Sequence, residues 1–278
     1  MSAHVCYPGG ASHVATIAGA DAALGELINI VGVSGVSAGA LVAIARAFRV
    51  ERSALAAVLE DLLQDNRVLD VAPFRLGDGG ICAWEVIPKA VLRLVGRVTF
   101  ADAHIPLCIV ATNLDTGTPR YLSSWATPRV RIHEAARATS AIPVLAPTVA
   151  IPSLGTEMSP DVRLHCDGGL TDNTADHAFD ASPVPRIALR LAGGDDVVRV
   201  RHGDNVGQAL ATFRASTWAA SRLKSTRLDG LVIDLPAPGS GLDFSLSVDE
   251  IRARWRAGYD AVMRRADGVR SFRERSSP

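Results

Sequence analysis

The sequence predicts a three-layer α/β/α fold with a largely parallel central sheet. Short apolar runs typical of buried strands alternate with longer segments of helical periodicity along most of the 278 residues. One strand leads through a glycine-rich turn straight into a helix, which is a connection typical of such folds. Neither a repeat nor a shift in composition divides the chain, so we expect residues 1–278 to form a single domain.

The first half of the chain contains the clearest elements. Apolar runs predict strands at residues 3–7, 29–33 and 105–112, and the last of these turns back into a short hairpin arm at 119–122. Apolar residues at helical spacing predict helices at 14–28, 38–48, 51–64, 84–95 and 132–139.

The second half continues the alternation with longer connections. Strands are predicted at 163–166, 187–191 and 231–235, and helices at 206–222 and 248–265. Proline and glycine interrupt residues 66–82 and 146–160, so we expect these two segments to be irregular.

Charge and cysteine content narrow the class of protein. Lys plus Arg and Asp plus Glu both number 29, and this balance argues against nucleic-acid binding, which needs a basic surface.

The N-terminus shows no secretory signal, and no apolar run approaches the length of about eighteen residues that a spanning helix needs. The four cysteines, Cys6, Cys82, Cys108 and Cys166, lack CxxC spacing, and most of them are expected to be small buried hydrophobic residues.

A glycine-bracketed serine follows the second predicted strand. Gly35-Val36-Ser37-Ala38-Gly39 fits the G-x-S-x-G nucleophile elbow, a tight turn that needs small residues on both sides of the serine. The turn holds the hydroxyl near a helix N-terminus, where backbone N–H groups stabilise developing negative charge. Ser37 is therefore the candidate nucleophile, and the alternative is a glycine-rich turn whose serine has no catalytic role.

Asp167 is the candidate base. It follows the predicted strand 163–166 and precedes Gly168 and Gly169, so we expect its carboxylate on a tight turn at the sheet edge that carries Ser37. Burial there would raise its pKa and allow it to accept the serine proton directly. The competing interpretation is a solvated aspartate in an ordinary Asp-Gly turn.

A histidine is the other base that a serine nucleophile can use. In the chain order Ser, Asp, His that α/β-hydrolases use, only His177 and His202 follow a suitable acid. Neither stands in a clear strand-end loop with a glycine beside it. A Ser-His-Asp triad therefore remains an alternative.

Gly9 and Gly10 lie in the turn between the first predicted strand and the first helix. Consecutive small residues leave backbone N–H groups free to converge on an oxyanion, as acyl transfer requires. The alternative is an ordinary strand-to-helix loop.

In content and in order, these motifs resemble the patatin-like phospholipase family. In that family a glycine-rich oxyanion turn, a G-x-S-x-G elbow and a D-G-G or D-G-A motif follow one another. The matching positions are Pro8 to His13, Gly35 to Gly39 and Asp167 to Gly169, and further similar stretches lie at residues 99–102, 105–107, 111–117, 135–143 and 167–173. The similarity covers about residues 4–180, and it implies a patatin-like fold in which residues 181–278 complete the sheet and the outer helices.

The resemblance also implies the roles of individual residues. Ser37 and Asp167 would form a catalytic dyad that needs no histidine, no metal and no organic cofactor. The remaining site residues that it implies are the oxyanion-hole residues Gly9, Gly10 and Ala38 and the supporting glycines Gly35, Gly39, Gly168 and Gly169.

The oxyanion turn departs from the family pattern G-G-G-x-R/K-G. Pro8 replaces its first glycine, Ser12 its basic residue and His13 its last glycine. Gly9 and Gly10 can still present backbone N–H groups.

The activity that the resemblance implies is hydrolysis of a carboxylic ester on a glycerolipid or phospholipid, through an acyl-enzyme. Residues 66–82 and 146–160 are candidates for the border of an acyl-chain pocket. A soluble serine esterase with a Ser-His-Asp triad and a catalytically inactive lipid-binding relative are the alternatives.

The last predicted helix bears on membrane contact. Ile251, Trp255, Tyr259 and Val262 form one apolar stripe among several arginines. This pattern fits an interfacial helix or a helix docked on the core with a solvated basic face. We expect a cytoplasmic protein. Peripheral contact with a membrane is expected only if this helix is the interfacial one, and the sequence leaves the oligomeric state open.

Overall fold

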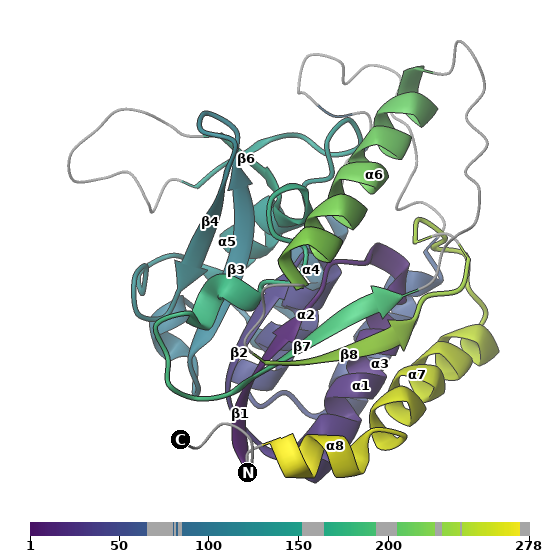
Figure 1. Ribbon diagram of the computed structural model, residues 1–278. Helices are drawn as coiled ribbons and strands as arrows, with labels where there is room; N and C mark the ends of the chain where they lie inside the picture. Colours follow the sequence, from purple (N-terminus) through teal and green to yellow (C-terminus); the bar gives the residue numbers. More distant parts are fainter. Residues whose placement is uncertain are drawn as a thin grey trace.

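A computed structural model describes residues 1–65, 80, 82, 85–151, 164–192, 205–225, 230–239 and 241–272 (Figure 1). Most of the two segments predicted to be irregular, 66–82 and 146–160, lies outside the described residues, and so does His202. The described residues form one central sheet with helices on both of its faces.

The sheet has the strand order β5-β6-β3-β2-β1-β7-β8, and β4 pairs with β3 off this path. The strands are β1 (Ser2–Tyr7), β2 (Asn29–Val36), β3 (Leu107–Asn113), β4 (Thr118–Ser123), β5 (Val149–Ala150), β6 (Leu164–Asp167), β7 (Arg186–Ala192) and β8 (Leu231–Pro236). All pairs from β8 through β7, β1 and β2 to β3 are parallel, whereas β4, β5 and β6 pair antiparallel. The predicted largely parallel sheet is confirmed.

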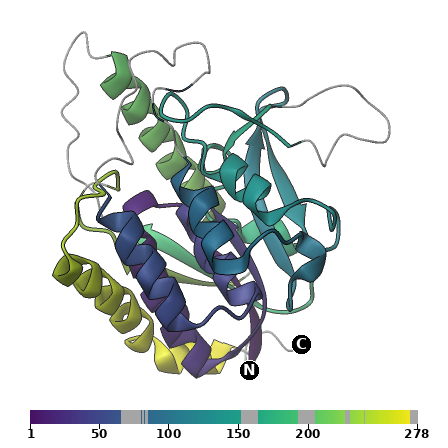
Figure 2. The ribbon, with the colours of Figure 1, turned by 180° about the vertical axis from the view of Figure 1, so that it is seen from behind.

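The helices cover both faces of the sheet. They are α1 (Val14–Leu27), α2 (Ala38–Ala47), α3 (Arg52–Leu63), α4 (Val86–Val95), α5 (Ile132–Thr139), α6 (Asn205–Ser225), α7 (Val248–Met263) and α8 (Ala266–Ser271), with short 3-10 helices η1 (Ala11–His13), η3 (Phe100–Asp102), η5 (Gly168–Leu170) and η6 (Asp176–Phe179). In Figure 1, α6 extends from the middle of the molecule toward the top of the view. Seen from behind, α3 and α4 lie in front of the sheet (Figure 2).

Three elements differ from the sequence expectation. Strand β2 continues to Val36 rather than ending at residue 33, because it stays paired with β3 up to the elbow. A short strand, β5, forms within the segment predicted to be irregular by pairing with β6. The predicted helix 248–265 ends earlier, and α8 follows it as a separate helix.

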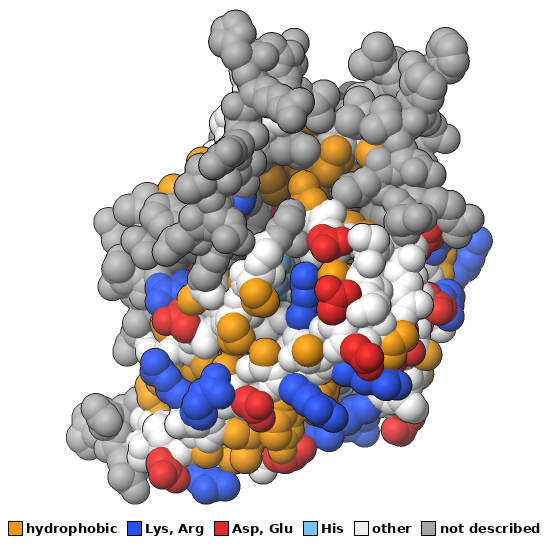
Figure 3. All heavy atoms as spheres, turned by 90° about the vertical axis from the view of Figure 1, so that its right-hand side faces the viewer, with side chains coloured by type: hydrophobic (Ala, Val, Ile, Leu, Met, Phe, Trp, Pro, Cys, Tyr) orange, Lys and Arg blue, Asp and Glu red, His pale blue; other side chains and the backbone are white. Residues whose placement is uncertain are grey.

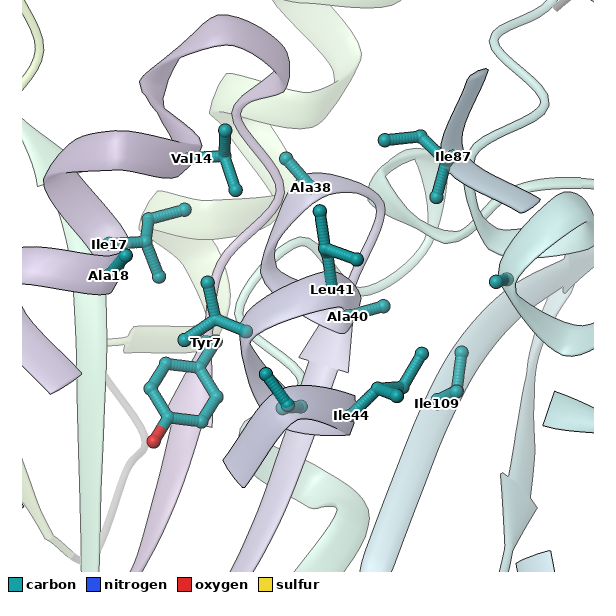
Figure 4. Close-up of a cluster of buried hydrophobic side chains, with 14 of the residues drawn as sticks. Tyr7, Val14, Ile17, Ala18, Ala38, Ala40, Leu41, Ile44, Ile87 and Ile109 are labelled. Atoms are coloured by element: carbon teal, nitrogen blue, oxygen red, sulfur yellow. The ribbon is translucent and has the colours of Figure 1, made fainter. Parts of the chain in front are cut away.

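Helix α2 is the centre of the core. Nearly all of its residues are buried, as expected for a helix that is apolar on all sides. Figure 4 shows Leu41 between Val14 of α1 and Ile87 of α4, with Ile44 turned toward Ile109 of β3. The helix that follows Ser37 is therefore fixed by packing on every side.

The apolar stripe of α7 is docked on the core. Ile251 and Val262 are buried, and Trp255 and Tyr259 pack partly buried against the same cluster. The Tyr259 hydroxyl also donates a 2.8 Å hydrogen bond to Glu26 of α1. Of the two interpretations of this helix, interfacial or docked on the core, the contacts of α7 agree with the second.

The structure also bears on the predictions for the cysteines and for a membrane-spanning helix. Cys6, Cys82, Cys108 and Cys166 are all buried, as expected for small hydrophobic residues. Among the residues that the structure describes, no helix is both long enough and apolar enough to cross a bilayer.

Two glycines allow α1 and α7 to approach backbone to backbone. A Cβ at Gly19 would lie 1.9 Å from the Trp255 carbonyl oxygen, and one at Gly258 would lie 1.9 Å from the Thr16 carbonyl oxygen. We expect Gly19→Ala and Gly258→Ala each to lower the free energy of unfolding by about 1–3 kcal/mol, because the helices must separate. Urea denaturation measures the change.

Gly268→Ala is the matched control on α8. A Cβ there meets nothing within 4 Å, so the substitution is expected to stabilise the protein by about 0.5–1 kcal/mol. Equal effects of Gly258→Ala and Gly268→Ala on stability would contradict the close approach of the two helices.

Candidate active site

Ser37 lies at the tip of a tight turn between β2 and α2. Its backbone has φ 49° and ψ −122°, a left-handed conformation that costs a residue other than glycine about 1–3 kcal/mol. The flanking glycines permit the turn, because a Cβ at Gly39 would lie 2.4 Å from the Pro8 carbonyl oxygen and one at Gly35 would lie 2.7 Å from the Ala40 Cα. The expected strand-turn-helix setting of the serine is present.

Two strands end head to head beside β3. Val36, the last residue of β2, pairs with Val110, and Asp167, the last residue of β6, pairs with the next residue, Ala111. Both strands lie on the same edge of β3, because β4 pairs along the opposite edge. Since β2 and β6 run toward each other, their ends bring Ser37 and Asp167 together.

Ser37 and Asp167 come together in a different way from the one that the sequence predicted. Asp167 was expected at the carboxyl edge of a parallel sheet, yet β6 is antiparallel to β3. The two residues meet because β6 continues the line of β2 from the opposite direction.

Asp167 is held firmly and is only 2% exposed. Its backbone N–H donates to the Ala141 carbonyl oxygen at 2.9 Å, and its own carbonyl oxygen accepts from the Thr112 hydroxyl at 2.8 Å. Its carboxylate accepts a hydrogen bond from the Gly169 N–H at 2.7 Å. The Ser37 hydroxyl lies near enough to this carboxylate to favour its charged form.

Burial raises the pKa of Asp167 from 3.8 to about 7, and the nearby Ser37 hydroxyl and the Gly169 N–H partly oppose this rise. A carboxyl group with this pKa exchanges a proton near neutral pH, as a general base must. Asp167 is thus buried, in contrast to the solvated aspartate of the competing interpretation.

Thr139, the last residue of α5, contacts the backbone of Ser37. The sequence had indicated no role for this residue. Its Oγ1 accepts a 2.9 Å hydrogen bond from the Ser37 N–H and donates to the Val110 carbonyl oxygen. A Cβ at Gly168 would lie 2.2 Å from that same carbonyl oxygen. The only signal in the sequence is a threonine at the end of a predicted helix.

The glycine turn before α1 lies against the elbow. The Gly9 N–H donates to the Asn173 carbonyl oxygen at 3.1 Å, and a Cβ at Gly9 would lie 3.3 Å from the Ser37 Cβ. Gly9 therefore differs from the sequence expectation, because its amide already has an acceptor. In the described part of the chain the amides of Gly10 and Ala38 are not engaged by an acceptor.

The histidines have other partners. His177, a candidate for a triad, places Nδ1 3.0 Å from the Asp180 carboxylate. His4 contacts the Ser182 hydroxyl at 2.8 Å, and His13 contacts the Gly10 carbonyl oxygen at 3.1 Å. Within the described residues, the hydrogen bonds of Ser37 involve Thr139 and Ala40 and no histidine.

Ser37 opens into a pocket with a mostly apolar wall. The residues that line the pocket with it are Ala11, Ala38, Leu62, Val86, Ile87, Ser140 and Phe244. These residues come from η1, the elbow and α2, α3, α4, the end of α5 and the segment before α7. Such a surface fits a hydrocarbon chain better than a polar group.

The fold and the site define an α/β protein with a buried serine and aspartate pair at a strand-to-helix turn. The profile of the patatin-like phospholipase family matches residues 5–179, and the chain belongs to this family. The sequence has no match among curated proteins.

Solved structures resemble the fold across almost the whole chain. VipD from Legionella pneumophila matches with a TM-score of 0.55 and 16% identity, over 96% of this chain and 67% of that one. The type III effector protein ExoU matches with a TM-score of 0.46 and 15% identity, over 97% of this chain and 53% of that one. This chain therefore spans about two thirds of the length of VipD and about half of that of ExoU.

The raised pKa of Asp167 predicts how stability depends on pH. The folded protein binds a proton at about pH 7, whereas an unfolded aspartate binds it near 3.9. The stabilising contribution of this proton is therefore fully present below the unfolded pKa, and it is lost as the pH rises through the folded pKa of about 7. The free energy of unfolding of the wild type should therefore fall by about 2–3 kcal/mol from pH 5 to pH 8, relative to that of Asp167→Asn, whose amide does not titrate. Urea denaturation at the two pH values measures this change.

Asp115→Asn, at an exposed position in the turn between β3 and β4, is the control. Its stability should follow the wild type at both pH values. A constant difference between Asp167→Asn and the wild type across this range would contradict the raised pKa.

Proposed function

We propose that this protein is a lipid acyl hydrolase that cleaves carboxylic esters through Ser37 and Asp167. The observation that carries the proposal is that Ser37 and Asp167 meet where β2 and β6 end beside β3, and that burial raises the pKa of Asp167 to about 7. Membership of the patatin-like phospholipase family supports the lipid as substrate. The apolar pocket beside Ser37 supports an acyl chain as the part of the substrate that is bound.

The reaction begins with proton transfer. Asp167 accepts the proton of the Ser37 hydroxyl while Oγ attacks the ester carbonyl carbon. The tetrahedral intermediate then collapses, and the proton on Asp167 passes to the departing alcohol. Water, deprotonated by the same carboxylate, attacks the acyl-enzyme, releases the fatty acid and restores the serine.

Backbone amides stabilise the oxyanion in this proposal. The Ala38 amide lies at the first position of α2, where the helix dipole adds positive potential. The Gly10 amide lies in the turn that packs against the elbow. Gly9 is assigned a supporting role, because its N–H donates to Asn173.

The acyl chain extends between α3 and α4. Leu62, Ile87 and Phe244 form its apolar walls. We also propose that the whole chain acts as one domain, because β7 and β8 pair in the same sheet as the strands that carry Ser37 and Asp167.

Removing either member of the dyad is the direct test. We expect Ser37→Ala and Asp167→Asn each to lower kcat by at least about 10³-fold on a short-chain nitrophenyl ester and on phospholipid vesicles. A fluorophosphonate should label the wild type and not Ser37→Ala.

His177→Ala is the control, because the imidazole faces Asp180 rather than Ser37. It should keep full activity, and loss of turnover in this variant would favour a histidine triad instead. A wild-type protein that the fluorophosphonate does not label would be an inactive lipid-binding relative.

The pH dependence of turnover tests the role of Asp167. Because only the carboxylate form accepts the serine proton, kcat/KM should rise about tenfold per pH unit below neutrality and level off above the pKa of about 7. The measurement is fatty acid release after quenching, from pH 5 to pH 9, with ester that is stable over this range. A flat profile would exclude Asp167 as the base.

A further inference from the structure

An arginine from the end of the chain reaches the turn before α1. Nη1 of Arg254, on α7, lies 3.1 Å from the Ser12 hydroxyl oxygen and 3.3 Å from the Ser12 carbonyl oxygen. Ser12 is fully buried in η1, two residues after Gly10. One guanidinium group therefore contacts both the side chain and the backbone of the turn.

Other residues near the end of the chain enclose the same turn. The Ser12 N–H donates to the Gly241 carbonyl oxygen at 2.8 Å. A Cβ at Gly10 would lie 2.1 Å from Cδ1 of Leu191 in β7, so Gly10 packs directly on that side chain. All three contacting residues lie beyond residue 179, where the family match ends.

The charge of Arg254 also acts on this turn. Burial lowers the pKa of His13 and the positive charge of Arg254 lowers it further, whereas hydrogen bonds with backbone carbonyl groups partly oppose this change. The carboxylates of Asp243 and Glu250 also lie within the field of Arg254, but each accepts hydrogen bonds from a nearby serine, Ser245 and Ser247 respectively.

Arg254 differs from the arginines beside it on α7. Arg252 and Arg256 are exposed, whereas Arg254 is half-buried. Figure 3 shows the side of the molecule that carries α7, where Lys and Arg side chains are interspersed with Asp and Glu side chains. The inward direction of Arg254 thus distinguishes it from a solvated surface charge.

We propose that Arg254 is a positioning residue that holds the turn from Pro8 to His13 in the shape needed for the Gly10 amide to meet the oxyanion. It supplies from α7 the positive charge that the turn itself lacks, since Ser12 occupies the position of a basic residue in the family pattern. The inference rests on the proposed hydrolase function.

The test compares Arg254→Ala with Arg256→Ala on the same helix. Arg254→Ala should lower kcat roughly 10- to 100-fold. This loss is smaller than the one that removal of an oxyanion-hole donor can cause. KM should stay within about twofold of the wild-type value. The rate of fluorophosphonate labelling of Ser37 should decrease by the same factor. Arg256→Ala should match the wild type in all three measurements.

Two further variants separate positioning from a general loss of structure. Arg254→Lys keeps the charge and should recover at least half of the lost kcat on a logarithmic scale. Adding Ser12→Arg to Arg254→Ala returns a guanidinium to the turn and should restore kcat by at least about tenfold. If Arg254→Ala does not fold, Ser12→Ala, which removes only the hydroxyl contact, should still lower kcat by about threefold or more.

Several outcomes would overturn the inference. These are equal kcat for Arg254→Ala and Arg256→Ala, a change confined to KM, or unchanged kcat in Ser12→Ala. They are distinguishable from failure of the proposed function, because Ser37→Ala and Asp167→Asn remain inactive if only the role of Arg254 is wrong. Activity that survives Ser37→Ala would instead refute the hydrolase proposal itself.

Discussion

The meeting of two strand ends beside Val110 and Ala111 of β3 is the constraint on which the site depends. Strand β2 stops at Val110 and β6 stops at Ala111, so the residue after one strand faces the last residue of the other. The Val110 carbonyl oxygen accepts the Thr139 hydroxyl, which in turn accepts the Ser37 N–H. Backbone pairing and one threonine together determine where the serine lies relative to the aspartate.

This arrangement is costly in stability. Ser37 has a backbone with positive φ, and the buried Asp167 has no positively charged hydrogen-bond partner among the residues that the structure describes. Such features persist only where the surroundings hold them, and here the buried helix α2 and the sheet do so. The same burial that destabilises the carboxylate gives it a pKa of about 7, so the cost in stability and the capacity for proton transfer have one cause.

The site also depends on the part of the chain beyond the family match. Strand β7 pairs with β1, and α7 packs on α1, so both flank the turn that precedes α1. Gly241 and Arg254 then bind the buried Ser12 directly. The turn from Pro8 to His13 is thus held by contacts with residues from the second half of the chain.

The sequence by itself determined the order of the elements, because strand and helix periodicity are local and α5 was predicted with its observed limits. It also singled out Ser37 and Asp167 as candidates, because short motifs carry the small residues that tight turns require. Only the tertiary structure decided that β6 runs antiparallel, that the Gly9 amide already has an acceptor, that Thr139 accepts the Ser37 N–H, and that Arg254 contacts Ser12. Strand direction and contacts across up to 242 positions follow from packing of the whole chain, which no local pattern encodes.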